Sequence, residues 1–162
     1  MSARPIAPLF VIRRASPEDA ETIARIVNGW AGRGEMLSRS SGEIAATHRE
    51  FLVAEEEGVI VGCGALALYG YDLAEIRSLA VRPDRLGSGI GAAITEALLA
   101  EADAQDIPQV IAFTYQPGFF ERLGFRVVEA DTLPRKAWTD CMRCIKRDFC
   151  DEFAMLRDIP GA

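Results

Sequence analysis

Three alternating glycines, Gly87, Gly89 and Gly91, stand between a strand-like run and a helix-like run. Glycine lets the backbone turn tightly and lets a ligand approach it closely. The first N–H groups of a helix are free to bind an anion, and the helix dipole favours negative charge there. No carboxylate stands in the loop after Arg85, and both Arg82 and Arg85 add positive charge. This segment predicts a phosphate-binding loop.

Three interpretations compete for this loop. A glycine-rich turn without a ligand is disfavoured by three alternating glycines at a helix start. A dinucleotide site is suggested by Gly87-Ser-Gly-Ile-Gly-Ala92, which fits a degenerate G-x-G-x-x-G/A pattern. That fingerprint needs an acidic residue at the end of the next strand, which here ends in Phe113-Thr-Tyr115. The third interpretation, a site for the pyrophosphate of coenzyme A, stays open on these residues alone.

The elements around the loop are predicted from hydrophobic period and turn signals. Helices are expected from Ser16-Pro17 to about Gly32, where Ser16 is the cap, and over residues 43–51, 90–104 and 119–123. Strands are expected over residues 10–13, 52–56, 59–68, 74–81, 109–114, 125–129 and 153–157. Three consecutive strands followed by alternation describe an α/β (mixed α+β) chain, with helices on the faces of a mixed sheet.

Composition bounds the class of protein. The 162 residues are 49% hydrophobic and 26% charged, which predicts one globular domain over residues 1–162, with residues 131–162 as its C-terminal tail. A net charge of −6 disfavours nucleic acid and anionic membranes as partners. The sequence shows no export signal and no membrane-span pattern, so we expect a cytoplasmic protein.

The segment from Ser78 to Gly91 resembles motif A of the GNAT acetyltransferases. In that motif a strand ends in apolar-Ala-Val, a loop containing proline follows, and R/Q-x-x-G-x-G/A opens a helix. Leu86 stands where the family prefers Arg or Gln, but the family holds the phosphates largely through backbone N–H groups. The resemblance implies the GNAT fold, a mostly antiparallel sheet of six or seven strands flanked by about four helices. It also implies acetyl-CoA as co-substrate, without a metal.

From Ile12 onward the chain also resembles the short, single-domain N-acetylglutamate synthases of bacterial arginine biosynthesis. The matching stretches include Met36-Leu-Ser-Arg-Ser40, Leu73-Ala-Glu-Ile-Arg-Ser-Leu-Ala-Val81, Phe113-Thr-Tyr-Gln-Pro-Gly-Phe-Phe120 and Leu133-Pro-Arg-Lys-Ala-Trp-Thr-Asp-Cys141. This resemblance implies direct acetyl transfer to the α-amino group of L-glutamate. The cofactor contacts that it implies are Leu79, Ala80, Val81, Leu86, Gly87, Ser88, Gly89, Ile90, Gly91, Ala92, Phe119 and Phe120.

Attack of an amine on a thioester needs a base, an oxyanion donor and an acid for the thiolate. Glu75, on the strand before the glycine loop, is the expected base, working through water; the alternative is a solvated strand residue. Many GNAT enzymes place an acid Tyr where this chain has Phe120. The acid role therefore falls to Thr114 or Tyr115, or to no side chain.

Glutamate brings two carboxylates, for which arginine offers a paired grip. Arg39 is the first expected contact, followed by Arg77 and Lys136; the alternative for each is a surface cation. His48 lies on an apolar helix face and is expected to be structural.

Cys141, Cys144 and Cys150 have the spacing C-x₂-C-x₅-C. Free thiols are favoured over a metal site, which would need a fourth ligand such as Cys63 or a carboxylate. The rival functions are acetylation of another amine, such as a polyamine, a drug or a protein N-terminus, and a non-catalytic module that binds acyl-CoA or metal. Feedback by arginine and a homodimeric state stay open.

Overall fold

The computed structural model describes residues 9–138 and 151–160. One seven-stranded sheet runs through it in the order β1-β2-β3-β4-β5-β7-β6. Only β4 and β5 are parallel, and every other neighbouring pair is antiparallel. The strands are β1 (Val11–Arg14), β2 (Phe51–Glu56), β3 (Val59–Leu68), β4 (Ala74–Val81), β5 (Gln109–Thr114), β6 (Arg126–Val128) and β7 (Phe153–Asp158).

Within residues 9–138 and 151–160, four α-helices lie on this sheet: α1 (Ala20–Ala31), α2 (Ser41–Ala46), α3 (Ile90–Ala104) and α4 (Pro117–Glu121). Short 3-10 helices are η1 (Pro17–Asp19), η2 (His48–Glu50), η3 (Pro83–Arg85), η4 (Ala130–Thr132) and η5 (Arg135–Trp138). The expected mixed, mostly antiparallel sheet with four helices is therefore confirmed. Within the described residues no helix has the length and apolarity needed to cross a bilayer.

The prediction of one helix over residues 43–51 is wrong at its end. Helix α2 stops at Ala46, η2 follows, and Phe51 begins strand β2. The spacing of Ile44, His48 and Phe51 fits a helix, but Phe51 pairs with Ala65 of β3 and is 4% exposed. Burial against the neighbouring strand overrides the local helical pattern. The strand expected from residue 125 likewise begins one residue later, at Arg126.

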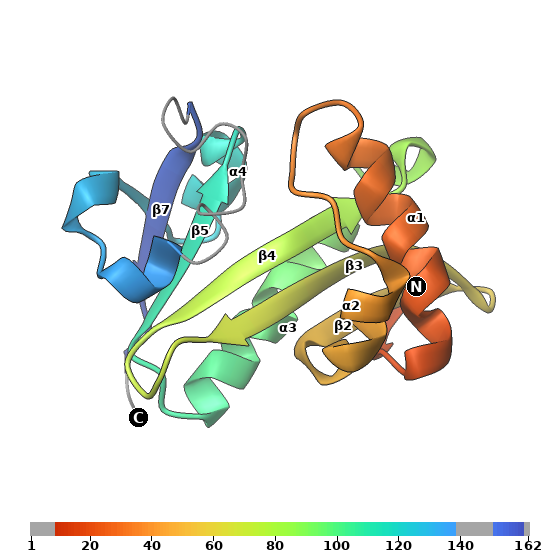
Figure 1. The fold of residues 1–162 in the computed structure, drawn as a ribbon, viewed down its shortest axis with the longest axis horizontal. Coiled ribbons are helices and arrows are strands. Elements are labelled where there is room, and N and C mark those ends of the chain that lie inside the picture. Colours follow the sequence, from red (N-terminus) through yellow and green to blue (C-terminus); the bar gives the residue numbers. More distant parts are fainter. Residues whose placement is uncertain (1–8, 139–150, 161–162) are drawn as a thin grey trace, which may run out of the picture.

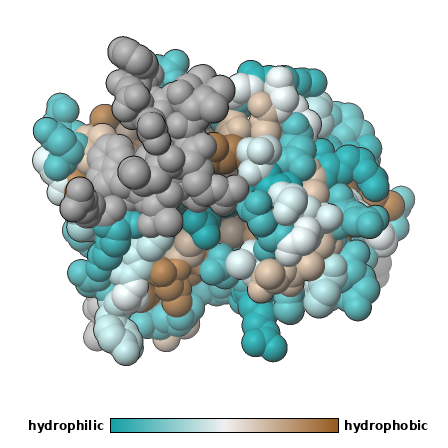
Figure 2. All heavy atoms as spheres, viewed as in Figure 1, coloured by the Kyte–Doolittle hydropathy of each residue, from teal (hydrophilic) through white to brown (hydrophobic). Residues whose placement is uncertain are grey.

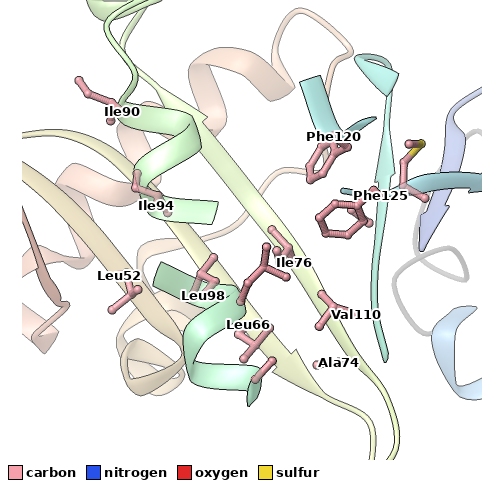
Figure 3. Packing of buried hydrophobic residues seen from close by; sticks show 14 of the residues in the cluster. Leu52, Leu66, Ala74, Ile76, Ile90, Ile94, Leu98, Val110, Phe120 and Phe125 are labelled. Atoms are coloured by element: carbon pink, nitrogen blue, oxygen red, sulfur yellow. The ribbon is translucent and has the colours of Figure 1, made fainter. Parts of the chain in front are cut away.

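Helix α3 covers one face of the sheet, and α1 and α2 cover the other (Figure 1). Ile90, Ile94 and Leu98 recur at the four-residue spacing of a buried helix face and pack over β3 (Figure 3). A Cβ on Gly62 or Gly64 of β3 would lie 2.8 Å from a methyl carbon of Ile90 or Ile94, respectively. These two glycines therefore let α3 lie close to the sheet and fix the position of its first turn.

Strands β4 and β5 meet at one end and then separate (Figure 1). Their pairing covers only Ala74 with Val110 and Glu75 with Ile111. Beyond that point β5 continues along β7, and β4 continues along β3 through an irregularity at which Ser78 takes a positive φ of 54°. The edge of β4 that follows Glu75 is therefore left without a strand partner from β5.

An ion-pair cluster ties η1 to the edge of the sheet. The guanidinium of Arg13 donates to Asp19 at 2.7 Å and to Glu55 at 2.6 Å. The hydrogen bond from Arg13 lowers the pKa of Asp19 to about 2. A carboxyl whose folded pKa is depressed adds stability above its unfolded pKa, and this stability is lost as the pH falls through the folded value.

We therefore expect Asp19→Asn to lower the free energy of unfolding at pH 7 by about 1 kcal/mol, after allowance for solvent screening. The gap between variant and wild type should close as the pH falls from about 4 towards 2, because Asp19 is then protonated in the wild type too. Urea unfolding at several pH values measures the gap. Equal stability of the two proteins at pH 7 would contradict the expected contribution.

Candidate active site

The glycine loop enters α3 through two left-handed residues. Gly87 has φ 79°, and Gly89, the N-cap of α3, has φ 84°. A Cβ on either would meet nothing within 4 Å, so the space in front of the loop is open. The first bond of the helix runs from the N–H of Ala93 to the carbonyl of Gly89, so the earlier amides have no partner within the helix. This cradle fits a pyrophosphate.

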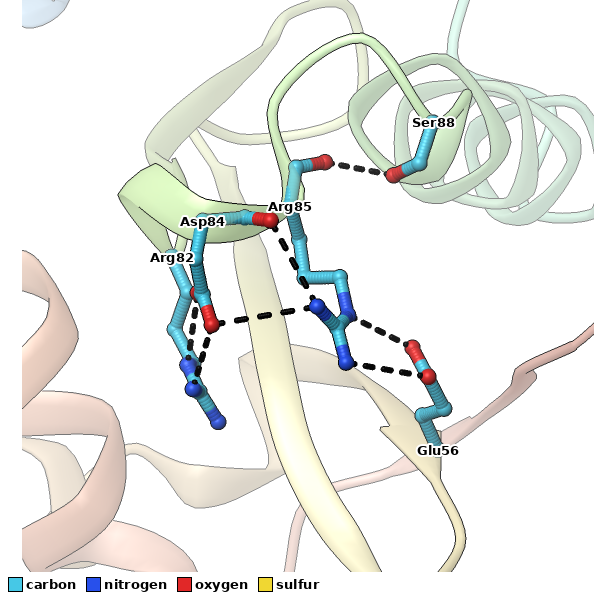
Figure 4. Close-up of polar contacts among 5 residues, drawn as sticks. All are labelled: Glu56, Arg82, Asp84, Arg85 and Ser88. Carbon is cyan, nitrogen blue, oxygen red and sulfur yellow. Dashed lines mark hydrogen bonds and ion pairs between the residues drawn. The ribbon is translucent and has the colours of Figure 1, made fainter.

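The arginines beside the loop are paired with carboxylates. Arg85 donates to Glu56 at 3.0 and 3.2 Å, and Arg82 donates to Asp84 at 2.7 and 3.1 Å (Figure 4). The Ser88 hydroxyl donates to the carbonyl of Arg85 at 2.5 Å. The positive charge expected from Arg82 and Arg85 is therefore largely offset, and the attraction for an anion comes mainly from the helix amides.

Aromatic side chains of α4 border the loop. A Cβ on Gly91 would lie 3.5 Å from the ring of Phe119, which places that ring against the first turn of α3. Phe119 meets Phe120 edge to face, and Phe120 meets Phe125 in the same way, with 5.1 Å between ring centroids in each pair. Phe120 is buried in the core, so of the two expected contacts Phe119 borders the loop and Phe120 supports it.

The other expected cofactor residues divide between surface and core. Leu86 is exposed, whereas the side chains of Ile90, Ala80 and Val81 are buried, so these three can face a ligand only through their backbone. The carbonyl of Val81 accepts a hydrogen bond of 2.9 Å from the indole N–H of Trp30 on α1. Sequence reasoning missed this contact between α1 and the end of β4.

Glu75 lies where β4 and β5 separate. It pairs with Ile111 in the last parallel pair of the two strands. Its side chain is 4% exposed, and its Oε1 accepts a hydrogen bond of 2.6 Å from the hydroxyl of Tyr69. Glu75 is therefore not a solvated surface residue. A buried carboxylate on the strand that leads to the glycine loop is suited to accept a proton.

Thr114 and Tyr115 stand where β5 ends. Thr114 is buried, and its hydroxyl oxygen accepts the N–H of Gln116 at 2.8 Å. The hydroxyl of Tyr115 donates to Asp151 at 2.8 Å. The Thr114 hydroxyl accepts that bond through a lone pair, so it can also donate its own proton to a hydrogen bond, whereas the hydroxyl of Tyr115 already donates to a carboxylate.

The three expected substrate cations differ in their surroundings. Arg39 is held through its backbone: its carbonyl accepts from Asn28 at 2.8 Å, and its N–H donates to the same amide at 2.9 Å. Arg77 lies 3.7 Å from Glu50, and Lys136 pairs with Asp72. Asn28, which sequence reasoning missed, thus fixes the loop that carries Arg39.

The expected metal ligands are only partly described. Cys63 is fully buried, burial raises its pKa to about 12, and its thiol donates to the carbonyl of Ser78 at 3.4 Å. Such a thiol is poorly suited to act as a thiolate ligand. Cys141, Cys144 and Cys150 lie outside the described residues. Elsewhere in the described chain, no three His, Cys, Asp or Glu side chains form a group that could hold a metal ion.

Neither of two surface hollows in the described part of the chain marks the glycine loop or the surroundings of Glu75. The face of α1 and α2 is largely hydrophilic, with small apolar patches (Figure 2). A hollow of about 410 Å³ lies beside Arg14 and Glu101, and one of about 340 Å³ lies beside Trp30 and Arg82. Neither is lined by Glu75 or by Gly87, Gly89 or Gly91, so residue chemistry and strand geometry define the site better than these two hollows do.

Comparison with known families decides the class of protein. The acetyltransferase (GNAT) domain family matches residues 47–127, half of the chain, from η2 to the start of β6. The chain belongs to the GNAT acetyltransferase family. An uncharacterized N-acetyltransferase of Chlorobaculum tepidum is 41% identical over 91% of this chain and 96% of its own. The amino-acid acetyltransferase of Mycobacterium tuberculosis is 35% identical over 88% of this chain and 83% of its own.

Solved structures agree with this assignment. Rv2747 from Mycobacterium tuberculosis, solved in complex with CoA, has a TM-score of 0.81 and 31% identity over 93% of this chain and 99% of its own. N-acetylglutamate synthase from Neisseria gonorrhoeae, complexed with CoA and N-acetyl-glutamate, has a TM-score of 0.84 and 25% identity. The match covers 93% of this GNAT chain and 35% of that longer one. This chain is thus an N-acetyltransferase that depends on acetyl-CoA.

Proposed function

We propose that this acetyltransferase transfers the acetyl group to the α-amino group of L-glutamate, the first step of arginine biosynthesis. The observation that carries amine acetylation is the buried carboxylate of Glu75 at the point where β4 and β5 separate. The acceptor is supported by relatives named amino-acid acetyltransferase and by Arg39 on a loop anchored to α1.

Acetyl-CoA supplies a thioester, an acyl group already activated towards an amine. Glu75 accepts the proton of the amine, directly or through one water, so that the nitrogen lone pair can attack the acetyl carbon. The backbone around Leu79–Val81 polarises the acetyl carbonyl. As the C–S bond breaks, CoA leaves as a thiolate that accepts a hydrogen bond from the hydroxyl of Thr114, and the second proton of the nitrogen passes to this thiolate, directly or through water. The products are an N-acetyl amino acid and CoA, with no covalent enzyme intermediate.

An acceptor panel tests the substrate. Release of free thiol from acetyl-CoA is measured with L-glutamate, L-glutamine, L-aspartate, D-glutamate, spermidine and a peptide with a free N-terminus. We expect the highest kcat/KM for L-glutamate, with L-glutamine reporting the contribution of the second carboxylate. A preference for spermidine or the peptide would overturn the glutamate assignment. CoA binding without turnover of any amine would favour a non-catalytic module.

Arg39→Ala tests the carboxylate contact. Loss of one partner of a buried, hydrogen-bonded charge pair typically costs on the order of 2 to 5 kcal/mol, so we expect the KM for glutamate to rise by about 30-fold or more. The KM for acetyl-CoA should stay close to that of the wild type. Arg25→Ala is the matched control, because Arg25 is an exposed arginine on α1.

Two results would contradict this role for Arg39. Equal changes in both KM values would indicate that its side chain only supports the loop. An unchanged KM for glutamate would indicate that Arg77 or Lys136, not Arg39, binds the substrate carboxylate. Both of these cations already lie beside protein carboxylates.

A further inference from the structure

Tyr69 occupies the loop between β3 and β4, where its backbone and its ring are both fixed. Its N–H donates to the carbonyl of Leu73 at 2.8 Å, which closes the loop. Its ring packs in a cluster that includes Leu73 and Ile111 of β5. The β3–β4 hairpin and the neighbouring strand β5 therefore fix the position of the phenol oxygen, because the Tyr69 side chain is packed and does not rotate freely in solvent.

A second contact braces the same loop. The ammonium group of Lys136 in η5 forms an ion pair with Asp72, three residues after Tyr69. A Cβ on Gly70 would lie 3.6 Å from that ammonium nitrogen, and Gly70 has φ 86°. Glycine meets both conditions without strain. The loop is thus held at its base by a backbone bond and beyond it by an ion pair.

The phenol of Tyr69 contacts Glu75 directly. Its hydroxyl donates to Oε1 of Glu75 at 2.6 Å, and the side chain of Glu75 is 4% exposed. A buried carboxylate loses its hydration, and a short hydrogen bond to the charged form offsets part of that cost. Since one oxygen is held by Tyr69, the rotation of the carboxylate is restricted and the direction of its second oxygen is defined.

We propose that Tyr69 is a positioning residue that holds the carboxylate of Glu75 in the orientation from which it accepts the amine proton. This inference rests on the proposed role of Glu75 as the base. It assigns Tyr69 no contact with either substrate and no proton transfer of its own.

The variant Tyr69→Phe removes the hydroxyl and keeps the ring in its cluster. Hydrogen bonds to charged groups are among the stronger ones in proteins, and we expect kcat to fall roughly 10- to 100-fold. The KM for acetyl-CoA and the Tm should stay close to those of the wild type. Tyr71→Phe is the matched control, because Tyr71 lies in the same loop and is 95% exposed, so its rates should not change.

A double-mutant cycle with Glu75→Gln separates positioning from general support. If Tyr69 acts through Glu75, Tyr69→Phe should cause no further loss of rate once Glu75 is already Gln. A loss of equal size in both backgrounds would overturn the inference, because Tyr69 would then act on something else. Wild-type rates for the single Tyr69→Phe variant would overturn it as well.

The four rates also separate this inference from the proposed function. A slow Glu75→Gln variant beside a wild-type Tyr69→Phe variant leaves Glu75 as the base and removes the role of Tyr69. Wild-type rates for Glu75→Gln would remove the base assignment and the inference with it. If the panel identifies an amine other than glutamate, the cycle is measured with that amine, and its outcome judges Tyr69 independently of the acceptor.

Discussion

Glu75→Gln should lower kcat/KM roughly 10²- to 10⁴-fold at neutral pH, the range expected for loss of a general base. Glutamine keeps the shape of the side chain and can still accept from Tyr69, but it cannot take up a proton. Acetyl-CoA affinity and the Tm should remain near the wild-type values. Steady-state kinetics measure kcat/KM, calorimetric titration measures the affinity for acetyl-CoA, and thermal unfolding measures the Tm. Glu96→Gln on the exposed side of α3 is the matched control.

The pH dependence gives this prediction a second readout. The residual activity of Glu75→Gln should rise with pH, because a growing fraction of the amine is then neutral and needs no base. The wild type, which has Glu75 to take the amine proton, should depend less steeply on pH over the same range. Near wild-type rates for Glu75→Gln at neutral pH would show that water or another group, not Glu75, accepts the amine proton.

Gly89→Asp should abolish acetyl-CoA binding. Gly89 has φ 84° at the N-cap of α3, and the space in front of it is open. An aspartate there would fill the anion cradle and set a negative charge against the pyrophosphate at the end of the helix where the dipole favours anions. Calorimetric titration should show a Kd at least 100-fold weaker, a change of about 2.7 kcal/mol.

Two further variants control this experiment. Gly58→Asp places the same residue at φ 80° in the β2–β3 turn, where a Cβ also meets nothing within 4 Å, so it reports the cost of backbone strain alone. Gly89→Asn keeps the bulk without the charge and should bind acetyl-CoA with intermediate affinity. A Gly89→Asp protein that is folded and keeps its affinity would rule out a phosphate cradle at α3.

Most of the fold could be predicted because its signals are local. The spacing of Ile90, Ile94 and Leu98 predicts α3, and the Glu57-Gly58 turn between apolar runs predicts the β2–β3 hairpin; both residues of that turn have positive φ. The failure at residues 43–51 has a non-local cause. Phe51 belongs to β2 because it is buried beside β3, and this contact cannot be recognised from the spacing of apolar residues along the chain.

Only those features of the candidate site that depend on the type and position of a single residue could be predicted from the sequence. Glu75 and the glycines stand out by type and position, whereas their surroundings depend on contacts between separate elements. The hydroxyl of Tyr69 reaches Glu75 only because a hairpin folds back on itself, and Glu50 meets Arg77 across 27 positions of sequence. Asn28 and Trp30 bind backbone atoms of distant residues, and a backbone partner leaves no mark in the amino-acid pattern.

Helix α1 holds two distant parts of the chain within one turn of its length. Asn28 binds the backbone of Arg39, and Trp30, two residues further on, binds the carbonyl of Val81. The loop that carries Arg39 and the end of strand β4 are therefore both attached to the same helix. A ligand that displaces α1 while binding at one of these places changes affinity at the other, and thermodynamic linkage makes the factor identical in both directions. If the acceptor binds at Arg39 and acetyl-CoA beside Val81, as proposed, the two substrates need not touch for each to alter the dissociation constant of the other.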